Sequence, residues 1–308
     1  MLKRRQFLKS AGTFALGGLM IPRRALANLF TGTMTHPVGL QLYTMNAVID
    51  QDVPGTLEKV AAIGYRELES AFSAKGAFYG YTPKAFSALT RQYGLSWISH
   101  HVLGAPFQFP PNGKMPLDKQ GKPVHFPPMM NLKDNGPELV DEAAAGGLSW
   151  LVCATTPIGS LDEIQASIRV LNRSGELARK AGIQLAYHNH FMEFRPVQGK
   201  IPYDLLLHGL DPDLVKMELD IAWATKGGAD PVKLFRENPG RFPLWHVKDI
   251  SADMNTLEPV GKGVVNFKRI FANARIAGMQ HFFVEHDHPP HPFASITTSY
   301  QYLKALQV

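Results

Sequence analysis

Four apolar runs in the second half of the chain each end on a residue that can bind a metal ion or carry a proton. The four runs end on His188, Asp220, His246 and Glu285. An apolar run that stops on such a side chain is typical of a strand in a parallel sheet whose carboxyl edge carries an active site. One such run is a weak indication, but four in succession are difficult to explain by packing alone. The repeat therefore favours a parallel sheet with a site at one edge.

Strand-like and helix-like patterns alternate along the chain after residue 37. Eight apolar runs are predicted as strands, at residues 38–43, 65–69, 95–101, 148–153, 183–188, 215–220, 242–248 and 281–286. Helical patterns follow them, at residues 53–63, 82–93, 137–145, 161–181, 203–208, from 231, at 267–277 and at the C-terminus. Eight alternations in about 270 residues predict an α/β fold, a single (β/α)8 TIM barrel. A doubly wound sheet is the weaker alternative, because no Gly-x-Gly-x-x-Gly motif follows the first strand.

Residues 1–27 have the pattern of an export signal. A basic segment precedes a short apolar segment, and Ala25-Leu-Ala27 supplies a small-x-small cleavage site. The apolar part is shorter than the ~20 residues that span a bilayer. Arg4-Arg5-Gln-Phe-Leu-Lys9 resembles the twin-arginine motif. We therefore expect a twin-arginine signal peptide at residues 1–27, a periplasmic barrel at 28–308 and no stable membrane insertion.

The formal charge of +6 does not indicate binding to nucleic acid. Six of the 32 basic side chains and none of the 26 acidic ones lie in residues 1–27, so the remainder is formally neutral. We therefore do not expect phosphate-driven DNA binding by the mature chain. The sequence leaves the oligomeric state open and is compatible with a homo-oligomer.

Residues 104–135 are rich in Pro, Gly and Lys and follow the third predicted strand. A segment of this length without its own periodicity is usually functional or disordered. We expect it to lie over the catalytic face as a lid, and a disordered insert is the alternative. The apolar side chains available to pack it down are Phe107, Phe109, Phe126, Met129 and Met130.

In a barrel, the carboxyl ends of strands five to eight converge on one mouth. His188, Asp220, His246 and Glu285 are therefore predicted as ligands of one divalent metal ion. Two imidazoles and two carboxylates suit Mn²⁺, Zn²⁺, Co²⁺ or Fe²⁺ better than Ca²⁺. For each residue taken alone, a hydrogen-bonded barrel residue is the alternative.

Several motifs resemble the sugar-phosphate isomerase/epimerase superfamily, the xylose isomerase-like TIM barrels. The motifs are Val38–Tyr43, Glu58–Tyr65, Leu185–His190, Glu218–Trp223, His246–Asp249 and Gly261–Asn266. The resemblance implies one Mn²⁺-like ion held by Asp220, His246 and Glu285, and a sugar or keto-sugar substrate. Many members have Glu at the position of His188. The Tyr-His-Asn-His form here instead resembles the branch with inosose dehydratase-like enzymes and keto-sugar lyases.

The resemblance also implies proton abstraction next to a carbonyl, through an enediolate. His190 or Glu193 is predicted as the base, Glu285 as a ligand and second base, and Lys248 as an electrostatic partner of substrate oxygens. The predicted function is a sugar isomerase or epimerase. A keto-sugar or inosose dehydratase or lyase on the same scaffold is the alternative.

Further side chains at strand ends are candidates for the substrate pocket. These are Glu69, His100 or the neighbouring His101, and Trp223, which could stack on a sugar face. Packing is the alternative role for each of them.

Two other classes of protein share this barrel. A chain that resembles the apurinic-site endonucleases would have a three-metal site, with one extra histidine two residues after the Asp of strand six. This chain has Ala222 at that position. A non-catalytic periplasmic sugar-binding barrel would have no need of the complete set of four ligands. Both are therefore disfavoured.

Overall fold

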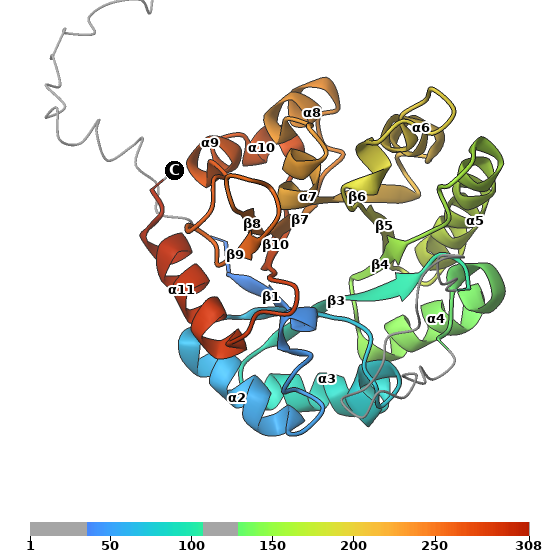
Figure 1. The fold of residues 1–308 in the computed structure, drawn as a ribbon. Helices are drawn as coiled ribbons and strands as arrows, with labels where there is room; N and C mark the ends of the chain where they lie inside the picture. Colours follow the sequence, from blue (N-terminus) through green and yellow to red (C-terminus); the bar gives the residue numbers. More distant parts are fainter. Residues whose placement is uncertain (1–35, 107–128, 308) are drawn as a thin grey trace, which may run out of the picture. The chain divides into compact units, whose positions relative to one another are not determined.

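Eight parallel strands close into a barrel in the computed structural model, which describes residues 36–106 and 129–307 (Figure 1). The barrel strands are β1 (Gly39–Gln41), β2 (Glu67–Ser70), β3 (Ser96–Leu103), β4 (Trp150–Thr155), β5 (Gln184–His188), β6 (Val215–Asp220), β7 (Leu244–Val247) and β10 (His281–Val284). They neighbour one another in chain order, and β10 pairs with β1 to close the ring. The predicted TIM barrel is confirmed.

Helices surround the strands, as Figure 1 shows. They are α2 (Val53–Ile63), α3 (Pro83–Gln92), α4 (Leu132–Gly146), α5 (Leu161–Lys180), α6 (Pro202–Gly209), α7 (Ile221–Lys226), α8 (Pro231–Glu237), α9 (Phe267–Phe271), α10 (Ala274–Ala277) and α11 (Pro292–Ala305). Several begin at a capping side chain. Asp52, Thr82 and Ser160 each accept a hydrogen bond from a backbone N–H in the first turn.

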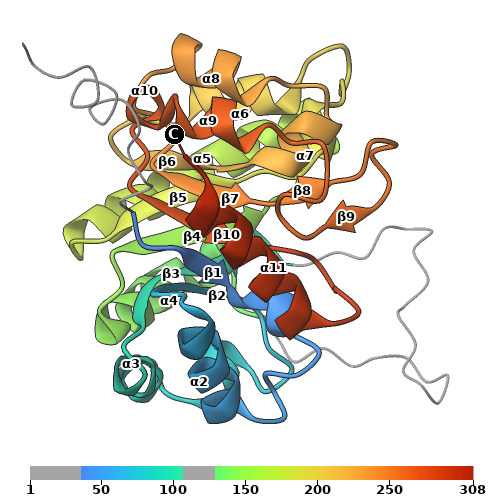
Figure 2. The ribbon, with the colours of Figure 1, turned by 90° about the vertical axis from the view of Figure 1, so that its left-hand side faces the viewer.

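Short elements at the strand ends were not predicted from the pattern. β1 stops at Gln41 because a 3-10 turn, η1 (Leu42–Met45), begins there and the Gln41 side chain accepts from the Tyr43 N–H. Two further 3-10 turns are η2 (Ala77–Gly80) and η3 (Met192–Phe194). The loop after β7 forms a two-stranded antiparallel hairpin of β8 (Asp249–Ile250) and β9 (Leu257–Glu258), which extends beyond the barrel (Figure 2).

Helix α4 begins five residues before the predicted start. Asn131 caps it by accepting from the Asp134 N–H, and the helix is kinked at Asn135, just before Pro137. The pattern prediction recognised the helix only after the kink. The last residues of the predicted 104–135 lid are therefore helical.

The predicted signal peptide and the lid residues Phe107, Phe109 and Phe126 lie outside the described residues. Met129 and Met130 are described and partly buried. The lid and the signal peptide remain predictions. Within residues 36–106 and 129–307, no helix combines the length and hydrophobicity of a membrane span.

The barrel interior changes from apolar to polar along the strands. A buried cluster inside the barrel is formed by Trp150, Val152, Ala186, Leu244 and Phe283. Two residues further along their strands, and so on the same face, Ala186, Leu244 and Phe283 are followed by His188, His246 and Glu285. The predicted site therefore lies above an apolar floor.

Candidate active site

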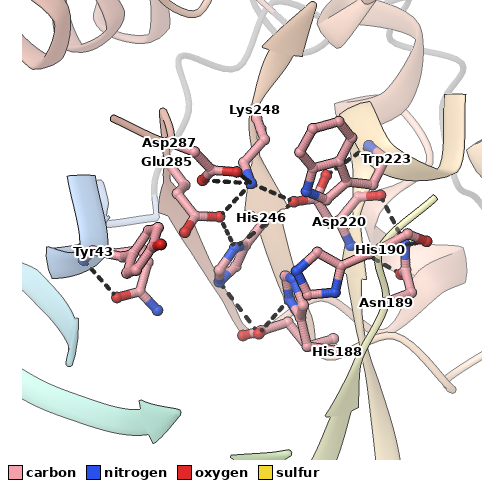
Figure 3. A network of polar contacts seen from close by, with 12 residues as sticks. Tyr43, His188, Asn189, His190, Asp220, Trp223, His246, Lys248, Glu285 and Asp287 are labelled. Carbon is pink, nitrogen blue, oxygen red and sulfur yellow. Dashed lines mark hydrogen bonds and ion pairs between the residues drawn. The ribbon is translucent and has the colours of Figure 1, made fainter. Parts of the chain in front are cut away.

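Asp220, His246 and Glu285 come together at the carboxyl ends of β6, β7 and β10 (Figure 3). One ligand atom from each lies within 4.8 Å of the other two. The Nδ1 atom of His246 is 2.6 Å from Glu285 Oε2 and 4.0 Å from Asp220 Oδ2. All three side chains are buried. We call these three residues the mouth group.

Lys248 lies among the carboxylates of the mouth. Its ammonium group is 3.0 Å from Asp220 Oδ2, 2.7 Å from Glu285 Oε2 and 3.0 Å from Asp287 Oδ1. Burial by itself lowers the pKa of Lys248, but the carboxylates of Asp220, Asp287 and Glu285 outweigh burial and hold that pKa well above its usual range. Lys248 is therefore a fixed cation beside the mouth group, which suits an electrostatic role.

A second polar group lies deeper in the barrel and converges on Glu218. Its Oε2 atom is 2.9 Å from His101 Nε2, 3.0 Å from His188 Nδ1 and 3.2 Å from His246 Nε2. The pleat explains this depth, because Glu218 precedes Asp220 by two residues on β6. We call these four residues, His101, His188, Glu218 and His246, the deeper group.

Glu69 supports the deeper group from β2. Its Oε1 atom lies 2.9 Å from His101 Nε2 and 2.6 Å from His246 Nε2. Gln41 donates to Oε1 at 2.8 Å, and Ser99 donates to Oε2 at 2.5 Å. The Glu69 side chain is fully buried. Its contacts are those of a residue that orients histidines, and its predicted role in substrate binding is untested.

Burial and neighbouring charges raise the pKa of some residues of the deeper group and lower the pKa of another. Burial lowers the pKa of His101, but Glu69 and Glu218 outweigh it and raise that pKa to about 9. Burial and the charge of Glu69 raise the pKa of Glu218 to about 7. The pKa of His188 is held well below its usual range by burial and by the charges of His246 and His101. His188 is therefore a neutral imidazole.

His190 and Trp223 lie at the edge of the mouth (Figure 3). The His190 ring is 5.1 Å from the His188 ring and 6.5 Å from the Trp223 ring, between centroids. The Lys248 ammonium lies 4.9 Å from the Trp223 ring centroid. Both side chains are half-buried. His190 and Trp223 therefore lie beside the mouth group, and their roles in proton transfer and substrate stacking stay predictions.

Two predicted site residues lie away from the mouth. The Tyr187 hydroxyl donates to Glu193 Oε1 at 2.8 Å, and Tyr187 alternates with the inward-facing His188 on β5, so Glu193 lies on the outer side of the strand. His100 Nδ1 is 2.8 Å from Ser70 Oγ, and its ring packs against Phe78. The geometry brings neither side chain to the predicted metal ligands.

Sequence reasoning did not single out Glu218 or Asp287. Each is two residues from a predicted ligand on the same strand or strand end, Asp220 in one case and Glu285 in the other. The two-residue period of a strand was the available signal, because it puts such pairs on one face. Of the two histidines at the end of the third strand, the structure brings His101 to the site.

The mouth group fits a divalent ion. It offers one imidazole and two carboxylates, a donor set that binds ions such as Mn²⁺ and Zn²⁺. The buried Asp220 Oδ2 forms an ion pair with the Lys248 ammonium at 3.0 Å and has no other polar partner at hydrogen-bond distance. His188, the fourth predicted ligand, turns its Nδ1 toward Glu218 in the deeper group.

The fold and this buried group of potential metal ligands define the class of protein. The family profile of the xylose isomerase-like TIM barrel matches residues 134–306, which is more than half of the chain. The chain belongs to this family.

Individual relatives show how similar this chain is to particular members of the family. The inosose dehydratase of Geobacillus thermodenitrificans is 27% identical over 169 residues, which cover 48% of this chain and 56% of that protein. The match thus spans little more than half of that relative. A crystal structure described as a sugar phosphate isomerase/epimerase from Parabacteroides distasonis is 29% identical, with a TM-score of 0.70, and covers 89% of this chain and 96% of that one.

The structure of the IOLI protein with a bound zinc atom has a TM-score of 0.62 at 13% identity. It covers 86% of this chain and 96% of that one. At this identity the likeness concerns the fold alone.

Proposed function

We propose that the protein is a metal-dependent dehydratase or lyase that acts on a keto-sugar or an inosose. The observation that carries this proposal is the identity of the side chains that β5 and its following loop bring to the mouth. An epimerase of this superfamily would use a carboxylate on each side of the substrate carbon. Here β5 presents His188 and the adjoining His190, while the Glu193 carboxylate bonds Tyr187 on the outer side of the strand. One imidazole, acting as base and then as acid, is sufficient for an elimination.

The roles of the residues follow from their positions. Asp220, His246 and Glu285 would hold the divalent ion, Mn²⁺ in the first instance with Zn²⁺, Co²⁺ or Fe²⁺ as alternatives. When bound, such an ion supplies Lewis acidity toward the substrate carbonyl. Lys248 adds a fixed positive charge where negative charge develops on substrate oxygens.

His190 is the proposed acid–base residue. It takes the proton from the carbon next to the carbonyl, and the electron pair of that C–H bond becomes the new C=C bond. The C–O bond on the adjacent carbon breaks, and the same proton is returned to the departing oxygen. The products are water, or an alcohol, and an unsaturated ketone.

The hydrogen bonds of the loop after β7 favour a substrate without a phosphate group. Loops after the last barrel strands frequently bind phosphate through backbone N–H groups. Here the N–H groups of Gly261, Gly263 and Val265 donate to the carboxylate of Asp249, at 2.8–3.1 Å. A buried side chain of the protein thus already occupies these donors, so a substrate phosphate would have to displace it.

The proposal includes export to the periplasm by the twin-arginine route. It rests on the basic and apolar pattern of residues 1–27. Phosphorylated sugars are mostly cytoplasmic, so an exported enzyme would act on unphosphorylated ones, in agreement with the Asp249 contacts.

A sugar isomerase or epimerase is the second candidate. It is supported by the description of the Parabacteroides distasonis structure as a sugar phosphate isomerase/epimerase, at 29% identity over 89% of this chain. Its reaction would share the proton abstraction and differ in returning the proton to carbon.

Proton NMR in D₂O with inososes, 3-keto-glycosides and free ketoses tests the proposal. We expect loss of a substituent from one of the first two classes, with added Mn²⁺. Deuterium uptake into unchanged or isomerised ketose, with no elimination from any substrate, would favour the second candidate. His190→Gln should abolish the reaction, and the matched control His291→Gln, in an exposed position after β10, should not. A fully active His190→Gln protein would refute the assignment of the base.

A further inference from the structure

The deeper group, His101, His188, Glu218 and His246, is distinct from the mouth group that the proposed function uses. It lies one step further into the barrel, and one ligand atom from each of its four residues lies within 4.8 Å of the others. Its members come from β3, β5, β6 and β7 and are each at most 5% exposed. His246 belongs to both groups but presents different nitrogens to them, Nε2 to the deeper group and Nδ1 to the mouth group.

Hydrogen bonds within the deeper group do not satisfy all of its polar atoms. Three imidazole nitrogens point at one oxygen, Glu218 Oε2, which can use all three only if each nitrogen carries a proton. The second oxygen, Glu218 Oε1, is buried and has no hydrogen-bond partner. Buried polar atoms without partners are uncommon and often mark the place of an ion or a functional group. Three convergent imidazoles beside such an oxygen are a ready set of metal donors.

The surroundings have the features that a metal site needs. Glu69 contacts both His101 and His246 and is itself held by Gln41 and Ser99, which is the arrangement of an outer carboxylate that orients histidine ligands. Phe283 of the apolar floor packs edge-on against His246, with ring centroids 6.4 Å apart. The side chains of this floor are buried.

We propose that His101, His188, Glu218 and His246 bind a second divalent metal ion, deeper in the barrel than the ion of the mouth group. Three imidazoles and one carboxylate favour a borderline ion such as Zn²⁺ or Co²⁺, whereas the two carboxylates of the mouth group also suit the harder Mn²⁺. Because His246 presents a different nitrogen to each group, it would be available to both sites. This inference does not depend on which sugar reaction the enzyme performs.

The test measures metal binding rather than activity. Metal-free protein is titrated with Co²⁺, the bound metal is counted by elemental analysis after gel filtration, and the visible spectrum is recorded. We expect two equivalents in the wild type. His101→Gln removes a donor of the deeper group alone and should leave one equivalent, with loss of the intense absorption of four-coordinate Co²⁺. Asp220→Asn removes a donor of the mouth group alone and should also leave one equivalent, but keep that absorption.

His100→Gln is the matched control, because His100 neighbours His101 on β3 and bonds Ser70 outside the group. It should bind two equivalents. If far-UV circular dichroism shows that His101→Gln does not fold, Glu218→Gln keeps the same shape and should lose the same equivalent. The proposal is overturned if the folded variant binds as much Co²⁺ as the wild type, with an unchanged spectrum. Failure of the proposed function would instead appear as missing elimination in the NMR assay, whatever the metal count.

Discussion

Replacing Lys248 with methionine removes an ammonium group from among three carboxylates while keeping a side chain of similar length. In the wild type, the ammonium lies 2.7–3.0 Å from oxygens of Asp220, Glu285 and Asp287. The side chains of Lys248 and Asp220 are at most 1% exposed. Removing one partner of a buried ion pair typically costs ~3–5 kcal/mol, because the remaining charge is left uncompensated. At ~2 °C per kcal/mol for a protein of this size, the melting temperature should fall by about 6–10 °C.

The assay is thermal unfolding of metal-free protein, followed by circular dichroism at one scan rate. Lys233→Met is the matched control, since its pair with Glu237 is 3.8 Å long and both side chains are more than half exposed. Its melting temperature should change by less than about 1 °C, in line with the small contribution of exposed pairs. Adding Mn²⁺ should raise the melting temperature more in Lys248→Met than in the wild type, because the ion replaces the missing charge. Equal melting temperatures for the two variants would refute the reasoning.

Three further predictions concern pH, packing and substrate binding. In metal-free protein, the raised pKa of His101, from 6.5 to about 9, contributes stability that is complete below pH 6.5 and is lost as the pH rises to 9, by up to ~3 kcal/mol. The raised pKa of His246 acts in the same direction, so denaturant unfolding across this range should show a larger loss in wild type and His100→Gln than in His101→Gln. Gly39→Ala would put a Cβ atom 2.5 Å from the Phe282 carbonyl oxygen where β1 meets β10. It should therefore lower the free energy of unfolding by ~1–3 kcal/mol. In the control Gly136→Ala, the new Cβ atom meets only ordinary contacts, so the free energy of unfolding should not fall. Trp223→Ala should raise KM roughly 10-fold, about 1.4 kcal/mol, with a smaller effect on kcat, and Trp223→Phe should retain most of the affinity; an unchanged KM in Trp223→Ala would exclude the stacking role.

The barrel could be predicted because its signals are local. Strand β6 lies where the pattern of residues 215–220 placed it, and helix α2 has the predicted bounds, Val53–Ile63. Short apolar runs, helix periodicity, capping residues and prolines in first turns all act over a few residues. The kink in α4 was missed because Asn135 and Pro137 disrupt the periodicity on which that prediction depends.

The ends of the strands could be predicted only in part. In a barrel, the polar residue that stops an apolar run at the carboxyl end faces the mouth, and this reasoning located Asp220, His246 and Glu285 together. It also nominated Glu193 and His100, whose side chains bond Tyr187 and Ser70 instead. Which side of a strand a residue faces depends on the register and on bulges, such as the shift between Leu68 and Glu69 in the pairing of β2 with β3.

The sequence by itself determined the eight-fold alternation and the residues at which the strands end, because periodicity and turn chemistry are local properties of the chain. Only the tertiary structure decided how those ends combine. It divided the predicted ligands between two levels, with Asp220 and Glu285 above and His188 below, and it put His246 between them. It also brought Glu69 and His101 under the site and Lys248 between carboxylates. These contacts join residues up to 177 positions apart, and closure of the barrel, rather than any local pattern, makes them neighbours.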